Sequence, residues 1–174
     1  MYIRNNPLLL WCFLGFIFII SVGTILHFTY EWSNSNFLVS LFSPINESVW
    51  EHLKLGFFSL LFFSIIDYWF LSNIYNNYFL GKLLGILTME IFIVVIFYLY
   101  SSIVGHSVLP IDISLFFIGA ALCQLVSYKI MNLSINYERI NTISLFILLI
   151  ITILFFIFTI SPPKLDIFKD PRLK

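Results

Sequence analysis

The sequence predicts an all-α integral membrane protein, a bundle of about five transmembrane helices in a single domain over residues 1–174. Hydrophobic residues make up 60% of the chain and charged residues 10%, with a mean hydropathy of +1.00. Soluble domains average about 45–50% and about 25% for these two classes. Five long apolar stretches lie along the chain, and they do not alternate polar with apolar residues as the strands of a membrane barrel do.

Each of these stretches is long enough for a helix to cross the hydrocarbon core, which takes about 20 residues. They run near Leu8–Phe28, His52–Leu71, Phe79–Tyr100, Ile113–Tyr128 (extended, Ile111–Met131) and Ile143–Ile160. The first stretch is longer than the apolar core of a cleaved signal peptide, so we expect it to remain as a membrane helix. The longest connection, Thr29–Glu51, contains an apolar piece, Phe37–Phe42, that is too short to span and is expected at the interface.

The charge composition excludes one class of partner and predicts another. Nine Lys and Arg residues balance nine Asp and Glu residues, so we expect no basic surface for nucleic acid. The expected partner is the lipid bilayer, and the expected location is the cell membrane, crossed several times. Gly81 and Gly85 form a GxxxG pattern, which allows close packing against a helix of the same chain or of a second copy.

Five spans put the two termini on opposite sides of the membrane, and most potential metal ligands then fall on one side. We call the side of the N-terminus side A and the side of the C-terminus side B. Side B receives the following residues from the ends and connections of the spans: His27, Glu31, Glu47, Glu51, His52, His106 and Asp112. The sequence therefore predicts a functional site at side B.

The spacing of these residues favours one shared pocket. His27 and Glu31 lie four residues apart and share a helix face if the first helix continues that far. Consecutive helices joined on side B have neighbouring ends, so we expect His27, Glu31 and at least one of Glu51 and His52 to line that pocket. Imidazoles with carboxylates suit zinc, or iron and manganese, and also suit acid–base catalysis. The predicted metal ligands are His27, Glu31, Glu51 and His52. The predicted catalytic residues are these four and Asn46, with Asn46 and Tyr30 orienting the others.

Ordinary structural roles compete with these predictions. Ser43-Pro44 resembles a helix cap with proline at the first helical position. Glu47 and Glu51 would then only offset the positive end of the second helix. Glu90, near the centre of the third span, is either a neutral side chain hydrogen-bonded to another helix or a group that handles protons or solutes, because a charged carboxylate there is costly.

Two sequence blocks carry a resemblance to a known family. The first is His-Phe-Thr-Tyr-Glu-Trp, from His27 to Trp32, and the second is Ser-Pro-Ile-Asn-Glu-Ser-Val-Trp-Glu-His-Leu-Lys, from Ser43 to Lys54. Together they resemble the signature of a family of small bacterial integral-membrane proteins that is described as a domain of unknown function. The resemblance covers most of the chain and implies one compact membrane domain of bacterial origin. It implies no reaction, and Glu90 lies outside its blocks.

Three hypotheses for function follow, and they leave open whether the chain is an enzyme. The first is a membrane-embedded enzyme for metal-assisted or acid–base hydrolysis or transfer on a lipid or lipid-linked substrate, with a divalent transition metal such as zinc as the candidate cofactor. The second is a permease or binding component for a small solute or ion, in which Glu90 and Gln124 line the path. The third is a structural membrane subunit whose polar cluster only joins the first two helices.

Overall fold

The computed structural model describes residues 7–135 and 137–170, and those residues form helices and loops without a strand. Five helices are long and apolar enough to cross a membrane: α1 (Pro7–Trp32), α3 (Val49–Leu71), α4 (Tyr78–Val104), α5 (Leu109–Met131) and α6 (Glu138–Ile160). Two short helices, α2 (Phe37–Ser40) and the 3₁₀ helix η1 (Asp166–Phe168), lie outside these spans. The prediction of an all-α membrane bundle with five spans is confirmed.

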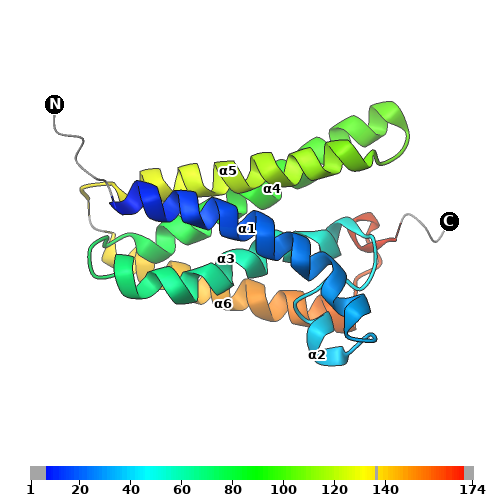
Figure 1. Ribbon diagram of the computed structural model, residues 1–174, viewed down its shortest axis with the longest axis horizontal. Helices are drawn as coiled ribbons and strands as arrows, with labels where there is room; N and C mark the ends of the chain where they lie inside the picture. The colour runs from blue at the N-terminus through cyan, green and yellow to red at the C-terminus, as the bar shows by residue number, and fades with distance from the viewer. Residues whose placement is uncertain (1–6, 136, 171–174) are drawn as a thin grey trace.

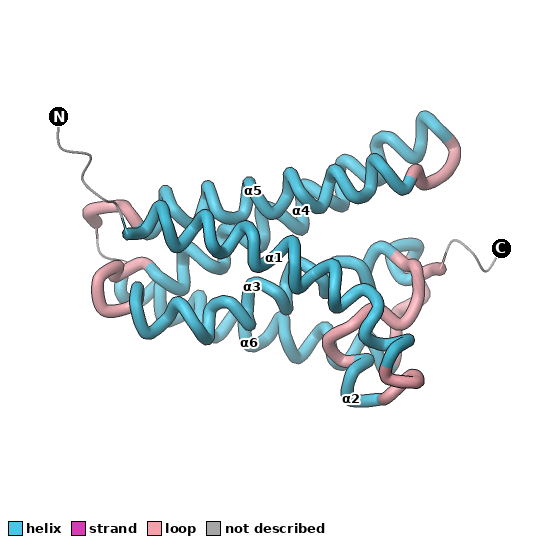
Figure 2. The backbone as a smooth tube through the Cα atoms, viewed as in Figure 1, coloured by secondary structure: helices cyan, strands magenta, loops and turns pink. Residues whose placement is uncertain are grey.

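The long helices run in alternating directions along one bundle axis. Figure 1 shows the α3–α4 and α5–α6 connections at the end where α1 begins. The α1–α3 connection, the α4–α5 hairpin and the C-terminal segment lie at the opposite end. The loops in Figure 2 are confined to these two ends, and the connections around α2 lie at the end opposite the start of α1. Sides A and B of the sequence analysis therefore correspond to the two ends of the bundle.

Helix α3 is the most buried of the five spans and packs against α1, α4 and η1. Its Phe57 and Phe58 rings also contact α6, where Phe155 lies 4.9 and 5.7 Å from them between ring centroids. Aromatic rings of this size fill the space between helices whose backbones stay apart. A site built on α3 is consequently held by packing on several sides.

Small residues bring α4 and α5 together much more closely. A Cβ atom added at Gly85 would lie 2.6 Å from the Cys123 carbonyl oxygen, which is closer than real contacts allow. The Ser127 hydroxyl donates a hydrogen bond of 3.0 Å to the Gly81 carbonyl. Of the two uses of the GxxxG pattern that the sequence leaves open, the structure shows the one within the chain.

The structure corrects the start of the second span. Helix α3 begins at Val49 and not after Ser43-Pro44, and its N-cap is Ser48, whose hydroxyl accepts a 3.3 Å hydrogen bond from the Glu51 backbone N–H. The Ser43 hydroxyl accepts instead from the Tyr30 backbone N–H and donates to the Leu26 carbonyl. Because Ser43 serves the last turns of α1, it cannot cap α3.

Helix α1 continues to Trp32, four residues beyond the predicted span. Glu31 is therefore helical and follows His27 by one helical turn, which was the condition for the two to share a face. The short apolar piece forms α2, and the Asn36 side chain caps it by accepting from the Leu38 backbone N–H. The side B ends of α1 and α3 thus meet with a compact loop between them.

Candidate metal site at side B

Two histidines from consecutive spans lie next to each other at side B. His27 comes from the last turns of α1 and His52 from the first turn of α3, and their ring centroids are 5.1 Å apart. The helix ends are neighbours, as expected for packed helices within about 10 Å, but the expected shared pocket is only partly found, because the hollow that His27 and Glu31 line includes neither Glu51 nor His52. The two imidazoles are close enough to bind one ion.

Glu47 from the loop before α3 completes a group of three side chains. One ligand atom from each of His27, Glu47 and His52 lies within 4.8 Å of the other two, and we call this group the side B cluster. The His52 Nε2 and Glu47 Oε2 atoms are 3.3 Å apart. Metal–ligand bonds of about 2.0–2.1 Å in a tetrahedral site separate neighbouring ligand atoms by about 3.3 Å. The Glu47–His52 pair therefore has the spacing of neighbouring metal ligands, and the three side chains together form a candidate site for a small divalent metal.

A backbone contact sets the orientation of the His52 ring. The Nδ1 atom lies 3.0 Å from the Ser48 carbonyl oxygen, which can only accept, so Nδ1 carries the proton. In a neutral ring Nε2 is then an acceptor, and it faces another acceptor, the Glu47 carboxylate. Two acceptors at this distance need a positive charge between them. A metal ion supplies it, and so does a second proton on His52.

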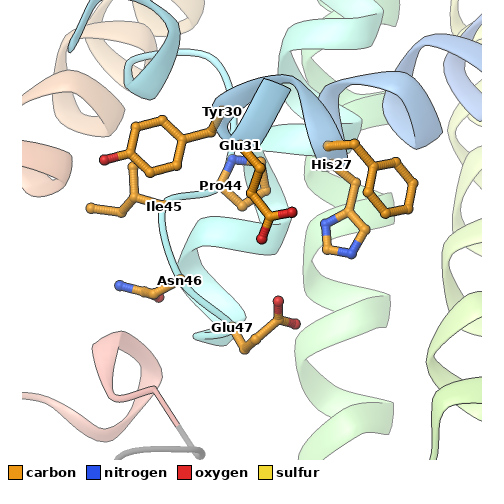
Figure 3. Close-up of a pocket in the computed structure, with 8 residues that line it drawn as sticks. His27, Tyr30, Glu31, Pro44, Ile45, Asn46 and Glu47 are labelled. Atoms are coloured by element: carbon orange, nitrogen blue, oxygen red, sulfur yellow. The ribbon is translucent and has the colours of Figure 1, made fainter. Parts of the chain in front are cut away.

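A hollow of about 130 Å³ opens beside the side B cluster. It is lined by the following residues of α1 and the loop before α3: His27, Phe28, Tyr30, Glu31, Pro44, Ile45, Asn46 and Glu47. Figure 3 shows the His27 ring and the Glu31 and Glu47 carboxylates facing a common space. Roughly a third of the His52 and Glu47 side chains is exposed (34% and 36%), so the cluster can be reached from outside.

The structure places Glu51 elsewhere, although the sequence suggested it as a ligand. Its carboxylate accepts a hydrogen bond of 2.6 Å from the Lys54 ammonium and one of 3.0 Å from the Ile45 backbone N–H. Lys54 also donates to the Ser40 carbonyl at 2.9 Å. Glu51 and Lys54 are both buried. This ion pair anchors the loop that carries Glu47, and Glu51 is not part of the side B cluster.

Asn46 and Tyr30 line the hollow on the side away from His27, as Figure 3 shows. The Asn46 side chain accepts a 2.9 Å hydrogen bond from the Ser48 backbone N–H. That bond closes a tight turn just before α3 and fixes the direction in which Glu47 leaves the backbone. Asn46 therefore positions the site through the loop and not by contact with the histidines.

The C-terminal segment closes over the same loop, a contact that the sequence did not predict. The Phe168 ring of η1 lies 4.8 Å from the Trp50 ring. The Asp170 carboxylate accepts a 3.4 Å hydrogen bond from the Glu47 backbone N–H. Nearby, a hydrogen bond from the exposed Lys169 ammonium lowers the pKa of the Asp166 carboxyl. The tail thus helps to hold Glu47 beside His52.

One group of buried ionisable residues and one single buried acid also lie within the bundle. At side A the Lys82 ammonium lies 2.5 Å from the Asp67 carboxylate, and the Tyr78 hydroxyl donates to the same carboxylate. We call these three residues the side A cluster. Deeper along α4, both Glu90 carboxylate oxygens are buried and have no hydrogen-bond partner among the described residues.

The comparisons with known proteins add a family and no activity. No curated protein and no solved structure matches the chain. The model of a family of unknown function (DUF6512) matches residues 1–172. The chain, a protein with five helices able to span a membrane, belongs to that family.

Proposed function

We propose that the protein is a zinc-dependent hydrolase of a bacterial cell membrane, with its active site at side B and a lipid or lipid-linked substrate. One observation carries this proposal: the convergence of His27, Glu47 and His52 next to a hollow that holds a further carboxylate, Glu31. Two imidazoles and one carboxylate with an adjacent open position are a common ligand set of catalytic zinc. Non-haem iron enzymes use a similar set, so the identity of the bound metal is part of the test.

Each side chain has a distinct role in this proposal. His27, Glu47 and His52 hold the ion, and the Ser48 carbonyl keeps the His52 Nε2 atom turned toward it. Glu31 lines the hollow without belonging to the ligand group, and it takes the proton of the attacking water as general base. A bound zinc ion lowers the pKa of water and polarises a carbonyl or phosphoryl oxygen.

The surroundings of the hollow favour a substrate that comes from the lipid phase. The hollow lies where α1 and α3 reach side B, at the ends of two spans. Beside it, the loop between these spans exposes apolar side chains, with Phe37 of α2 at 61% and Leu38 at 68% exposure. Exposed apolar residues beyond the ends of the spans suit the boundary between headgroups and acyl chains. A lipid in that layer would present its headgroup linkage to the site.

A carrier for an ion or a small solute is a second candidate, and the state of Glu90 favours it. A carboxylate buried at that depth without a partner is costly unless it is protonated or faces a bound cation. Gln124 also has a buried side-chain nitrogen without a partner in the described chain. Because Glu90 and Gln124 belong to α4 and α5, this function would be independent of the side B cluster.

The direct test of the hydrolase is metal-dependent product release. Protein purified with a tag other than polyhistidine is loaded with zinc and incubated with a bacterial lipid extract, and the released fatty acids and headgroups are identified by mass spectrometry. We expect products only with the metal, and we expect Glu31→Gln to lose the activity by about 100-fold or more while keeping its zinc. A zinc-loaded protein that releases nothing from any lipid class would contradict the proposal.

A further inference from the structure

Buried polar atoms without a hydrogen-bond partner among the described residues lie on three spans in the middle of the bundle. They belong to Ser59 of α3, Glu90 of α4 and Gln124 of α5, and α4 packs against both other helices. We propose that these three side chains form a proton site, with Glu90 as the group that binds the proton. The proposal rests on the second candidate function and names the ion of that carrier. It does not depend on the zinc hydrolase.

A glycine on α3 makes room for the Glu90 carboxylate. A Cβ atom added at Gly56 would lie only 3.4 Å from Glu90 Oε1. Both Glu90 carboxylate oxygens are buried, and within the described chain they have neither a hydrogen-bond nor an ion-pair partner. Glu90 follows the first residue of α4 by 12 residues, about 18 Å of helix, and lies further still from the last. An acid at this depth is costly as a carboxylate and is stable with a bound proton.

The proton site follows one face of α3. Gly56, Ser59 and Phe63 recur at intervals of four residues or fewer, so they share a side of the helix. Gly56 faces Glu90, and Ser59 follows within one turn. His52 precedes Gly56 by four residues on the same face, and its side chain is 34% exposed at side B. The row of polar groups therefore starts one helical turn from a surface that water reaches.

Gln124 marks the other end of this row. Its amide nitrogen and the Phe63 Cε1 atom both lie 2.8 Å from the position of a Cβ atom added at Gly15, so the amide and the ring meet there. The Lys82 ammonium of the side A cluster lies 5.2 Å from the centre of the same ring. From His52 to Phe63 the row extends for about 16 Å along α3. It thus connects the neighbourhood of one end of the bundle with that of the other.

The surroundings of Glu90 suit a proton better than a metal cation. Hard cations take about six or more oxygen ligands in proteins. The Cβ position at Gly56 lies 3.1 Å from the Met89 sulfur, and the Cys123 thiol of α5 interacts electrostatically with Glu90. These neighbours offer sulfur, and Ser59 adds a single hydroxyl. A proton needs one acceptor at a time, and the hydroxyl both accepts and donates. Buried acids serve as proton-binding groups in many pumps and transporters.

Proton uptake by liposomes tests the proposal. Liposomes that contain protein, potassium and a pH-sensitive dye are diluted into choline buffer, and valinomycin then creates a potential that is negative inside. We expect the lumen to acidify about tenfold faster than in protein-free liposomes, and we expect Glu90→Gln to remove most of this excess, because an amide keeps the size but does not bind the proton. Ser59→Ala should slow uptake several-fold. Glu138→Gln changes an exposed acid and should leave uptake unchanged.

A second ion and a second activity separate the possible failures. Sodium uptake that Glu90→Gln abolishes, without proton uptake, would overturn the proton assignment and leave the carrier standing. Uptake of neither ion by the unmodified protein would overturn the proposal and count against an ion carrier. Proton uptake that persists in a folded Glu90→Gln protein would overturn the role of Glu90. Zinc-dependent release of products from the lipid extract should be equal in Glu90→Gln and the unmodified protein, as expected for a proton site separate from the side B cluster.

Discussion

The two ends of the bundle hold ionisable residues in opposite arrangements, with the side A cluster buried and the side B cluster half-buried. In the side A cluster one carboxylate meets one ammonium and one phenol, so charge and hydrogen-bonding capacity are matched. The Lys82 ammonium also lies 5.2 Å from the centre of the Phe63 ring. In the side B cluster two imidazoles and a carboxylate converge next to a second carboxylate, and the described part of the chain brings neither lysine nor arginine to the lining of the hollow.

This difference separates a structural cluster from a candidate functional one. A matched ion pair in a membrane bundle satisfies itself and needs nothing from outside. A group of converging imidazoles and carboxylates can bind a metal ion or protons. Side B contains both types, because Glu51 and Lys54, the residues one before and two after His52 in α3, form a matched pair. The predictions below test whether charge matching distinguishes the two roles.

The largest effect is expected from breaking the matched pair at side A. Asp67→Ala leaves the Lys82 ammonium buried without its partner and should cost about 3–5 kcal/mol of unfolding free energy. The double variant Asp67→Leu with Lys82→Met removes both charges and should recover most of that loss. The measurement is an unfolding titration in mixed detergent micelles. Asp166→Asn breaks only an exposed pair and serves as the control. Additive losses in the double variant would contradict a matched pair.

A smaller effect is expected at the matched pair of side B. Glu51→Gln keeps an acceptor for the Ile45 backbone N–H but removes the charge that balances Lys54. We expect a loss of about 2–3 kcal/mol in the same titration, with zinc still bound. Glu138→Gln changes an exposed acid near a helix start and is the matched control. If Glu51→Gln kept its normal stability and lost zinc completely, Glu51 would be a metal ligand and not a partner of Lys54.

The smallest effect is expected from Glu90, a buried acid that belongs to neither an ion pair nor the side B cluster. Glu90→Gln retains size and hydrogen-bonding capacity and should change the unfolding free energy by less than about 1 kcal/mol. Zinc binding at side B should be unaffected. Transport of an ion or solute by reconstituted protein, if lost in this variant while the fold persists, would favour the carrier over a passive Glu90.

The fold was predictable because the bilayer imposes a length on each span. The apolar stretches gave all five helices, with ends only a few residues off. The start of α3 was missed because the sequence offers two serines near it, Ser43 and Ser48. Which one caps the helix depends on whether its hydroxyl is used elsewhere, and Ser43 is bound to the end of α1. That contact joins residues 13 or more positions apart, so local patterns do not contain it.

The site was predictable only in part, for a similar reason. His27 and His52 could be brought together because consecutive spans must meet where they are joined. Glu51 precedes Lys54 by three residues, a spacing typical of a helical ion pair. This spacing could have indicated that Glu51 pairs with Lys54 and does not bind a metal. The place of Glu47 depends on the turn at Asn46 and on Asp170, 123 residues away, which no local pattern reveals.

Zinc binding to the side B cluster tests the account most directly. Metal-free protein without a polyhistidine tag is titrated with zinc in detergent by calorimetry, at several pH values. The account predicts one zinc ion per chain and a loss of affinity of about 100-fold or more in His27→Ala and in His52→Ala. Affinity should also fall as the pH is lowered, because protons compete for the imidazoles. His106→Ala removes an exposed histidine of the α4–α5 loop and should bind zinc normally. Equal zinc binding by all three variants, or none by the unmodified protein, would contradict the metal site.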